Sequence, residues 1–541
     1  MFVKNVINDD FKNWKRGDCV FIEAPTGSGK TTFILDMLLP YSKKQGTEIL
    51  YLCNRFLLKE QIKAELAKRQ NLSGDMEWLE GVEEFDGITV LSYQKLQKLC
   101  AENASGKYLS GRYAYIVCDE IHYLIEDSAF NPETLRTLQF LKKEKEILIA
   151  ISATLAEVDE ILTEEKYGDL ILWNSQRQCS QYLKVVKVKG YLSSIIGVYR
   201  LIYFYKLSEL TSMDQIFYFR NYETVIDVIR KSDPKEKWLI FQSNKKRAHA
   251  LSKNIGEDAY LISADNKEDE VLAELVREEQ FHCRVLVSTK LLDNGINIKD
   301  LRLKHVLIDS ISKTEFLQML GRKRRVNADD TFTLYLPQKS IRIFQGYLTP
   351  EIQEIYKLLA TEIQTGEICR RVIKEKKFYD MISRFFIWEK GSFIKNPLAV
   401  KYYERQKDFV ERMLIEMRED QWAFVKEQLS WLGREKEFDG ENLLEYRVRA
   451  SIIKQIYEIL NQRKGRNLSR TEQEKLRLEI SKLISAGKIL ANQGSRLVGK
   501  KKINEFCVQS KIPFRIESVN GKHKGKETIW IVRRKEACSG L

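Results

Sequence analysis

The sequence predicts an α/β protein in which two tandem parallel-sheet domains are followed by a helical region and a small α+β C-terminal domain. Two observations predict the sheets: apolar β-branched runs alternate with amphipathic stretches up to about residue 340, and these runs fall into two groups. The third observation is the length, because 541 residues are too many for one hydrophobic core. We expect domains over residues 1–165, 166–345, 346–465 and 466–541.

Short apolar runs bounded by polar or turn residues are expected to be buried strands. They are CVFIEA (19–24), EILYLC (48–53), GITVLS (87–92), YAYIVCDE (113–120), ILIAIS (147–152), KWLIFQ (237–242), CRVLVST (283–289) and KHVLIDS (304–310). Five of these precede residue 155 and three follow residue 235. That grouping favours two α/β domains in tandem.

The second half of the chain changes character twice. From about 350 to 462 the sequence is expected to be helical, with aromatic and charged stretches such as FYDMISRFFIWEK and KYYERQKDFVERMLIEMRE. The last part has a helical stretch, TEQEKLRLEISKLISAG, then GKKKINEFCVQS, then strand-like PFRIESV and ETIWIVRR joined by NGKHKGK. Helices followed by a hairpin with a basic tip are typical of a winged-helix nucleic-acid-binding module.

The positive charge of the chain is concentrated at its C-terminal end. The formal net charge is +14, and residues 440–541 alone hold 23 Lys and Arg against 10 Glu and no Asp. Such a bias favours a polyanionic partner, since neutralised phosphates release counterions; the alternative is a basic domain that is merely soluble. We expect no membrane partner, because the most apolar span, 191–205, is too short for a bilayer and contains Arg200. The nine scattered Cys and the absence of a secretory run predict a cytoplasmic protein.

A phosphate-binding loop follows the first expected strand. The stretch APTGSGKTT (24–32) has Ala24 where the pattern G-x-x-x-x-G-K-[ST] has its first Gly, and a helical stretch follows. The two glycines let backbone N–H groups face a phosphate, Lys30 reaches the β- and γ-phosphates of ATP, and Thr31 offers a hydroxyl to Mg²⁺. The expected nucleotide-binding residues here are Ala24, Pro25, Thr26, Gly27, Ser28, Gly29, Lys30, Thr31 and Thr32.

An acidic pair, DEIH (119–122), ends the expected strand YAYIVC. A carboxylate at the C-terminal tip of a parallel strand lies beside the phosphate loop, so Asp119 is expected to hold Mg²⁺ and Glu120 to orient and deprotonate the attacking water. His122 is then placed to couple the nucleotide to a moving part. The strand ILIAIS ends in Ser152-Ala153-Thr154, which by itself is weak evidence because hydroxyl residues commonly end strands.

In this order, phosphate loop, DEIH, SAT and a later QMLGRKRR (318–325) resemble the DExH type of superfamily 2 helicases and translocases, which have two RecA-like domains. The resemblance covers roughly residues 15–340. It implies that Gln318, Arg322 and Arg325 face the ATP cleft, with Arg325 as a finger on the leaving phosphate. Lys323 and Arg324 stay open between packing, solvent and nucleic acid. The adenine-reading Gln motif of DEAD-box relatives is not found in the sequence, and Phe11 and Trp14 are candidates either for stacking on adenine or for the core.

The same resemblance implies further site residues. It assigns to nucleic-acid binding Asn54, Arg55 and Gln61 in LCNRFLLKEQ, Ser92, Tyr93 and Gln94 in LSYQKL, Ser243, Asn244 and Lys245 in LIFQSNKKR, and Thr289 in LVSTKLLDNGINI. It assigns Asp293 and Gly295 to the nucleotide, and Ser152, Thr154 and His122 to coupling. Asn54 replaces the Thr that is usual in the family.

The sequence therefore predicts an ATP- and Mg²⁺-dependent helicase or translocase, with single-stranded or forked DNA favoured as the substrate. Its setting would be replication, recombination, repair, a phage or a mobile element, and its protein partners replication, repair or nuclease proteins. Three alternatives remain open at this point: an RNA helicase, a translocase that moves on duplex or strips proteins from it without unwinding, and a nucleotide-switched DNA-binding initiator or defence-system subunit.

Overall fold

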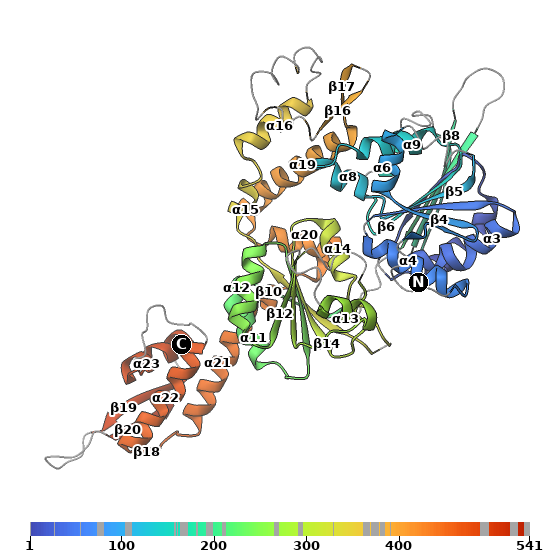
Figure 1. Cartoon of the computed structure of the whole chain (residues 1–541). Coiled ribbons are helices and arrows are strands. Elements are labelled where there is room, and N and C mark those ends of the chain that lie inside the picture. The colour runs from blue at the N-terminus through green and yellow to red at the C-terminus, as the bar shows by residue number, and fades with distance from the viewer. Residues whose placement is uncertain are drawn as a thin grey trace.

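The computed structural model contains two parallel β-sheets, a helical region and a small C-terminal domain (Figure 1). It describes residues 2–25, 27–54, 56–72, 81–102, 111–155, 158–159, 161–162, 171–179, 182–190, 199–207, 213–263, 270–289, 296–327, 329–360, 368, 378, 383, 385–389, 391–486, 497–519 and 529–534. The predicted fold class is confirmed. Among these residues no helix is long and apolar enough to cross a membrane.

The first sheet has nine strands. Their order is β3 (Glu84–Phe85), β4 (Ile88–Ser92), β2 (Glu48–Cys53), β5 (Tyr113–Asp119), β6 (Ile147–Ser152), β1 (Cys19–Glu23), β9 (Tyr199–Leu207), β8 (Tyr182–Gly190) and β7 (Ile171–Cys179). In this order, each strand from β4 to β9 pairs in parallel with its neighbour. Strand β3 pairs antiparallel with β4, and β8 and β7 extend the other edge by antiparallel pairing. The five expected strands of this half are all present. Because parallel strands end at one edge, the segments after β1, β5 and β6 meet there.

Helices surround the first sheet and bury both of its faces, which explains why its central strands are apolar throughout. They are α1 (Val3–Ile7), α2 (Lys30–Phe33), α3 (Leu39–Lys44), α4 (Phe56–Arg69), α6 (Tyr93–Ala101), α8 (Tyr123–Glu126) and α9 (Thr134–Lys143), with 3₁₀ turns η1 (Asp10–Asn13) and η3 (Asp127–Ala129) and a π-helical turn η2 (Ile34–Leu38). Phe11 and Trp14 lie in this core, in edge contact with Phe33. Their placement excludes a stacking surface for adenine.

The pairing of β9 with β1 differs from the boundary expected at residue 165. Cys19 to Glu23 pair in register with Ile202 to Lys206, so the chain returns to the first sheet before it starts the second. The aromatic side chains of YRLIYFYKL explain this position, because Tyr203 and Tyr205 pack into the same core as β1. We call the nine-stranded unit the first domain.

The second domain is a six-stranded, fully parallel sheet. Its order is β10 (Met213–Phe219), β15 (Phe332–Pro337), β14 (Leu303–Asp309), β11 (Lys237–Gln242), β13 (Val285–Ser288) and β12 (Ala259–Ile262). Its helices are α11 (Tyr222–Lys231), α12 (Lys245–Ile255), α13 (Glu270–Glu278) and α14 (Lys313–Leu320). The loop expected at 232–237 joins α11 to β11, and β10, β12 and β15 are strands that the sequence reading did not identify.

The region after the second domain is helical but contains a hairpin. Its helices are α15 (Ile341–Gln345), α16 (Pro350–Ala360), α19 (Pro397–Glu419) and α20 (Ala423–Trp431), with turns η5 (Glu435–Glu437) and η6 (Gly440–Asn442). The stretch FYDMISRFFIWEK was expected to be helical, and its end instead forms β16 (Phe386–Glu389), paired with β17 (Ser392–Lys395). Aromatic and β-branched residues favour a strand, and Gly391 supplies the positive φ of +81° in the turn.

The C-terminal domain has its own core. It consists of α21 (Leu444–Asn461), β18 (Asn467–Leu468), α22 (Arg470–Ala486), α23 (Lys500–Gln509), β19 (Phe514–Val519) and β20 (Ile529–Arg534). The three strands form an antiparallel sheet with β20 in the centre. Ile452, Ile456 and Leu460 of α21 belong to this core, so the unit begins before the expected boundary at 466. The order helix, strand, two helices and two strands is that of a winged helix.

Candidate nucleotide site and nucleic-acid groove

The phosphate loop joins β1 to α2 at the carboxyl edge of the first sheet. The N–H of Ala24 donates to the carbonyl of Ser152 at 2.9 Å, which fixes the start of the loop against β6. Gly27 and Gly29 have φ of +87° and +79°, values that residues with a Cβ rarely adopt. Lys30 Nζ donates to the carbonyls of Ala24 at 2.8 Å and Pro25 at 3.4 Å. Thr26 lies outside the described residues.

The loop fits a polyphosphate. The hydroxyl of Ser28 is buried and has no hydrogen-bond partner within the described part of the chain. Burial lowers the pKa of Lys30, Glu120 and Asp119 oppose that shift, and Arg324 and Arg322 add to it. Three cations therefore converge beside a glycine-rich helix N-terminus, and an anion bound there would stabilise all of them.

Two carboxylates lie beside the loop. Asp119 ends β5 and accepts hydrogen bonds from the Tyr51 hydroxyl at 2.6 Å and the Glu120 N–H at 3.0 Å. Burial and the charge of Glu120 raise the pKa of Asp119 to about 6. Burial also opposes ionisation of Glu120, but Lys30, His122 and Arg322 outweigh it and hold the pKa of Glu120 below its usual value. Glu120 is therefore the carboxylate that stays ionised and available to take a proton.

A hydrogen bond connects the DEIH segment to the second domain. His122 Nε2 accepts from the Gln318 side-chain amide at 2.9 Å, and His122 Nδ1 lies 2.7 Å from the Ser152 hydroxyl. With Gln318 donating to Nε2, the proton of the ring is on Nδ1, which donates to Ser152. The Ser152 hydroxyl in turn accepts from the N–H of Thr154 at 3.0 Å. The predicted coupling residues thus form one continuous chain of contacts.

The basic segment after Gln318 differs from its expected arrangement. Helix α14 ends at Leu320, Gly321 and Arg322 form a turn, and Lys323 then pairs with Ile298 in a β-bridge. Arg322 is buried and lies near Lys30 and Glu120, as expected of a cleft residue. Arg325 was expected in the cleft, but it is exposed and its Nε donates to the carbonyl of Asn327 at 2.8 Å. Arg324 lies against the phosphate loop instead, where a Cβ built on Gly27 would collide with its guanidinium.

The residues expected to contact nucleic acid fall into different environments. Tyr93 does not face a strand: it is fully buried, stacks on Tyr123 and donates its hydroxyl proton to the Asp119 carbonyl at 3.0 Å. Ser92 caps α6 by accepting from the Lys95 N–H. Gln94 is exposed and lies 3.5 Å from the side-chain oxygen of Asn54.

Others of this set lie in the second domain or outside the described residues. Asn244 caps α12, and Ser243 donates to the Asp309 carbonyl at 2.9 Å. Lys245 begins α12 and is exposed, and Thr289 is half-buried after β13. Arg55, Asp293, Gly295 and the side chain of Gln61 lie outside the described residues.

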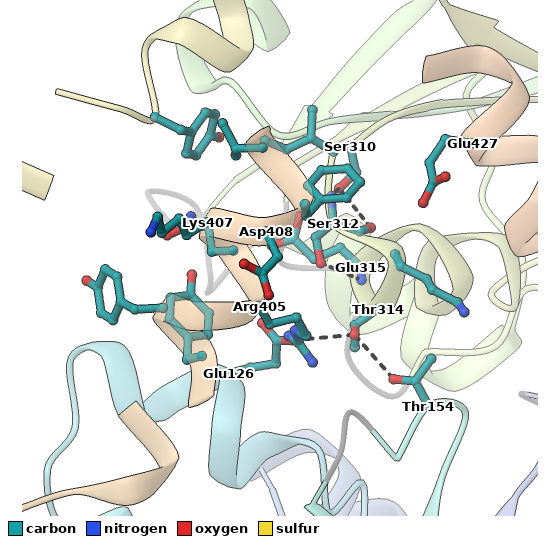
Figure 2. A pocket seen from close by; sticks show the side chains of 18 of the residues that line it. Glu126, Thr154, Ser310, Ser312, Thr314, Glu315, Arg405, Lys407, Asp408 and Glu427 are labelled. Atoms are coloured by element: carbon teal, nitrogen blue, oxygen red, sulfur yellow. Dashed lines mark hydrogen bonds and ion pairs between the residues drawn. The ribbon is translucent and has the colours of Figure 1, made fainter. Parts of the chain in front are cut away.

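A groove of about 1360 Å³ runs between the two domains and α19 (Figure 2). Its lining includes Thr154 of the first domain, Ser243 and Asn244 of the second, and Arg405 of α19. Acidic and basic side chains face it, and several are paired across elements: Asp309 with Lys339, Glu427 with Arg412, and Glu126 with Arg405. The groove is therefore bounded by three parts of the chain and not by the two domains alone.

The groove and the nucleotide site share a boundary at Thr154. The Thr154 hydroxyl lies 3.2 Å from that of Thr314, which donates to Glu126 at 3.5 Å, and Glu126 pairs with Arg405 (Figure 2). Thr314, Arg405 and Tyr51 were not identified from sequence. Of these three, only Tyr51 could have been suggested by its place in a strand. Strand β2 pairs with β5, and Tyr51 is one of the alternate residues of β2 whose side chains lie on the side of Asp119.

Two family models match this chain. Residues 2–157 match the model "Type III restriction enzyme, res subunit", and residues 220–327 match "Helicase conserved C-terminal domain". The first match covers part of the first parallel-sheet domain, and the second lies within the second one. The two matches and the two parallel-sheet domains support a superfamily 2 helicase with two RecA-like domains.

Two curated relatives are helicases, and each matches over 57% of this chain. "Putative helicase 22" of Sulfolobus islandicus filamentous virus is 24% identical over 335 residues, covering 57% of this chain and 58% of the relative. "Probable ATP-dependent RNA helicase DDX20" of Mus musculus is 25% identical over 328 residues, covering 57% and 36%. This chain therefore spans less than two thirds of the length of either relative.

Solved helicase structures show a looser likeness. The DEAD-box helicase Mss116 bound to ssRNA and UDP-BeF has a TM-score of 0.44 at 13% identity, covering 90% of each chain. The DUF1998 helicase MrfA bound to DNA has a TM-score of 0.42 at 15% identity, covering 76% of this chain and 54% of that one.

Proposed function

We propose that this protein is a Mg²⁺- and ATP-dependent helicase or translocase that moves on nucleic acid, with DNA as the favoured substrate. One observation carries the proposal: the nucleotide site is shared between two domains, through Gln318 and His122, and the groove lies between the same two domains. A ligand in the groove and a nucleotide in the cleft therefore both act on the same domain arrangement.

The chemistry proposed for the cleft is in-line hydrolysis of ATP. Lys30 neutralises charge on the β- and γ-phosphates once they displace the loop carbonyls from its ammonium group. The Glu120 carboxylate accepts the proton of the attacking water, and Arg322, which lies beside Glu120, stabilises negative charge on the leaving phosphate. Mg²⁺, held by Thr31 and Asp119, would neutralise charge on the same phosphates.

Movement follows from coupling the cleft to the groove. Arginines from the second domain accelerate hydrolysis only when the cleft is closed, so a strand that favours closure stimulates the ATPase. When the cleft opens after phosphate release, the two sides of the groove shift relative to one another. The contacts from Thr154 to Arg405 provide a direct path between the two sites.

The preference for DNA rests on the C-terminal domain. Its helix–strand–helix–helix–strand–strand order is a common DNA-binding arrangement, and the last hundred residues hold most of the excess positive charge. Replication, repair or nuclease proteins are the proposed partners. An RNA helicase and a translocase on duplex DNA are the alternatives that the substrate assays below separate.

The decisive assay measures ATP hydrolysis and strand displacement with single-stranded DNA, duplex DNA and RNA. We expect single-stranded DNA to stimulate hydrolysis most. Lys30→Ala and Glu120→Gln should each abolish turnover, because they remove the phosphate ligand and the proton acceptor. Lys12→Ala, an exposed lysine of the same domain paired with Asp9, is the matched control and should leave the rate unchanged. An ATPase that no nucleic acid stimulates would contradict the motor and favour a nucleotide-switched binding protein.

A further inference from the structure

After the turn at Arg322, the backbone is extended at Lys323, and this sets which side chains of the segment RKRR point to the same side. Arg322 accepts at its carbonyl from the Ile298 N–H at 2.8 Å, and the Arg324 N–H donates to the Ile298 carbonyl at 2.8 Å. These two bonds form a parallel bridge between Ile298 and Lys323. Because side chains alternate along extended backbone, Arg322 and Arg324 point to one side and Lys323 to the other. A helix would instead have paired Arg322 with Arg325.

Lys323 holds this register from the opposite side. It is buried, and its Nζ donates to Asp330 Oδ2 at 2.5 Å and to the Asp300 carbonyl at 3.0 Å. Lys323 is thus anchored inside the second domain. If the register of the segment shifted by one residue, an arginine would take the buried position of Lys323 and Lys323 would turn toward the cleft. The ion pair between Lys323 and Asp330 opposes this shift.

Arg324 is held in the cleft by contacts of its own. Its Nε donates to the side-chain oxygen of Asn297 at 2.7 Å. Its Cζ lies 3.2 Å from the point that a Cβ would occupy if residue 27 were not glycine. Burial, together with the charge of Arg322, lowers the pKa of Arg324 to about 9. An anion beside Gly27 would relieve this cost, and the phosphate loop is where a nucleotide places one.

We propose that Arg324, and not Arg325, is the second arginine that acts on the terminal phosphate of the nucleotide, with Lys323 as its positioning residue. In that step the water oxygen bonds to the γ-phosphorus, and the bond from phosphorus to the β–γ bridging oxygen breaks with its electron pair staying on ADP. The water proton passes to Glu120. The Arg324 guanidinium donates to the oxygens that gain charge. The inference rests on the proposed ATPase function and names one of its residues.

The test compares Arg324→Ala, Arg324→Lys and Arg325→Ala in the full chain. Each variant is assayed for ATP hydrolysis with a single-stranded oligonucleotide, for binding of a fluorescent ATP analogue and for thermal unfolding. We expect Arg324→Ala to lower kcat by about 10³-fold with analogue affinity within a few-fold, since an arginine finger acts mainly in the transition state. Arg324→Lys should be faster than Arg324→Ala, because lysine keeps the positive charge but lacks the several N–H donors of the planar guanidinium.

Arg325→Ala is the matched control, being the neighbouring arginine on the exposed side, and should keep kcat within about two-fold, as is usual for surface changes. The inference is overturned if Arg325→Ala loses turnover while Arg324→Ala and Arg324→Lys retain it. Failure of the proposed function looks different: the unmodified chain would then show no stimulated hydrolysis at all. If Arg324→Ala unfolds at a lower temperature, the comparison of Arg324→Lys with Arg325→Ala still tests the proposal. Full ATP hydrolysis in Arg324→Lys together with lost hydrolysis in Arg325→Ala would contradict it.

Discussion

At the scale of residues, the cleft depends on a few contacts that cross between domains. Gln318 is buried and donates to His122 at 2.9 Å, and the same ring contacts Ser152. Gln318 and His122 can form this hydrogen bond only when the two domains meet. We therefore propose that the pair senses closure of the cleft and does not act only as a source of stability.

We expect Gln318→Ala to reduce strand-stimulated ATP hydrolysis by at least ten-fold while ATP affinity stays within a few-fold. The reason is that the variant removes a contact made between domains and leaves the phosphate loop intact. His122→Ala and the double variant complete a double-mutant cycle, measured as kcat with saturating strand. If the two residues act through their contact, the double variant is no slower than the slower single variant. Additive losses would show that they act separately.

The same scale shows what sequence can predict about a site. The phosphate loop and DEIH could be located in the sequence because a strand–loop–helix pattern and a strand end determine the backbone there locally, and Gln318 because it begins the segment QMLGRKRR; the roles of these residues stay predictions. Arg324 was not assigned, because its direction depends on where α14 ends and on the bridge that Lys323 forms with Ile298, 25 residues before Lys323 in the chain. Tyr93 was misassigned because its burial depends on packing against Tyr123.

At the scale of elements, α19 connects parts that the sequence reading left separate. Leu398 near its start packs in the core of the first domain, and Val410 and Met413 pack in the core of the second. Arg405 lies between these ends and pairs with Glu126 of α8 (Figure 2). The helix therefore spans both domains, and any change in their arrangement acts on it.

Removing this pair should affect coupling more than stability. Both side chains are about 30% exposed, at 31% for Arg405 and 29% for Glu126. A partly exposed ion pair contributes roughly 1 kcal/mol or less, so Arg405→Glu should shift the unfolding temperature little. We expect it to lower stimulation of the ATPase by single-stranded DNA several-fold, measured as the ratio of rates with and without strand.

The charge-swapped double variant, Glu126→Arg with Arg405→Glu, is the control for this prediction. It restores the ion pair with reversed polarity, so coupling should recover if the pair itself transmits it. Continued loss in the double variant would indicate that Arg405 acts by contacting the strand directly.

The elements that sequence reading missed share a physical cause. The β16–β17 hairpin lies in a stretch whose aromatic residues also fit helical spacing, and the turn at Gly391 decides between them. The strand β9 was not assigned to the first sheet because its partner β1 lies 180 residues earlier. Local patterns predict that a strand exists, whereas its neighbours depend on contacts between distant segments.

At the scale of the whole molecule, the ATP machinery and the excess charge are in different places. The C-terminal domain has a separate core, and α21 links it to the second domain, where Glu445 accepts from the N–H groups of Arg220 and Asn221 at 2.9 Å. The phosphate loop and the cleft beside it lie in the first part of the chain, and the C-terminal domain presents lysines and arginines on its surface. We therefore expect mutations to separate the binding of a polyanion from the hydrolysis of ATP.

Helix α23 and strand β19 are where this separation is best tested. Lys501 and Arg515 are exposed on them and border one groove of about 860 Å³. We expect Lys501→Ala with Arg515→Ala to weaken duplex DNA binding and to lower the slope of log Kd against log salt concentration by roughly two, because each of these side chains would neutralise one phosphate. Lys30-dependent ATP hydrolysis without nucleic acid should not change, because the nucleotide cleft lies in other domains.

The matched control removes two lysines from the exposed surface of the second domain, Lys231→Ala with Lys235→Ala. It lowers the net charge by the same amount as the C-terminal pair, so a general effect of charge on DNA affinity would appear equally in both. Titrations of a fluorescent duplex from about 50 to 200 mM salt measure both slopes over a range in which phosphate binding changes affinity strongly. Equal slopes in the two variants would contradict a specific role for α23 and β19, and a larger loss on duplex RNA than on duplex DNA would favour the RNA helicase.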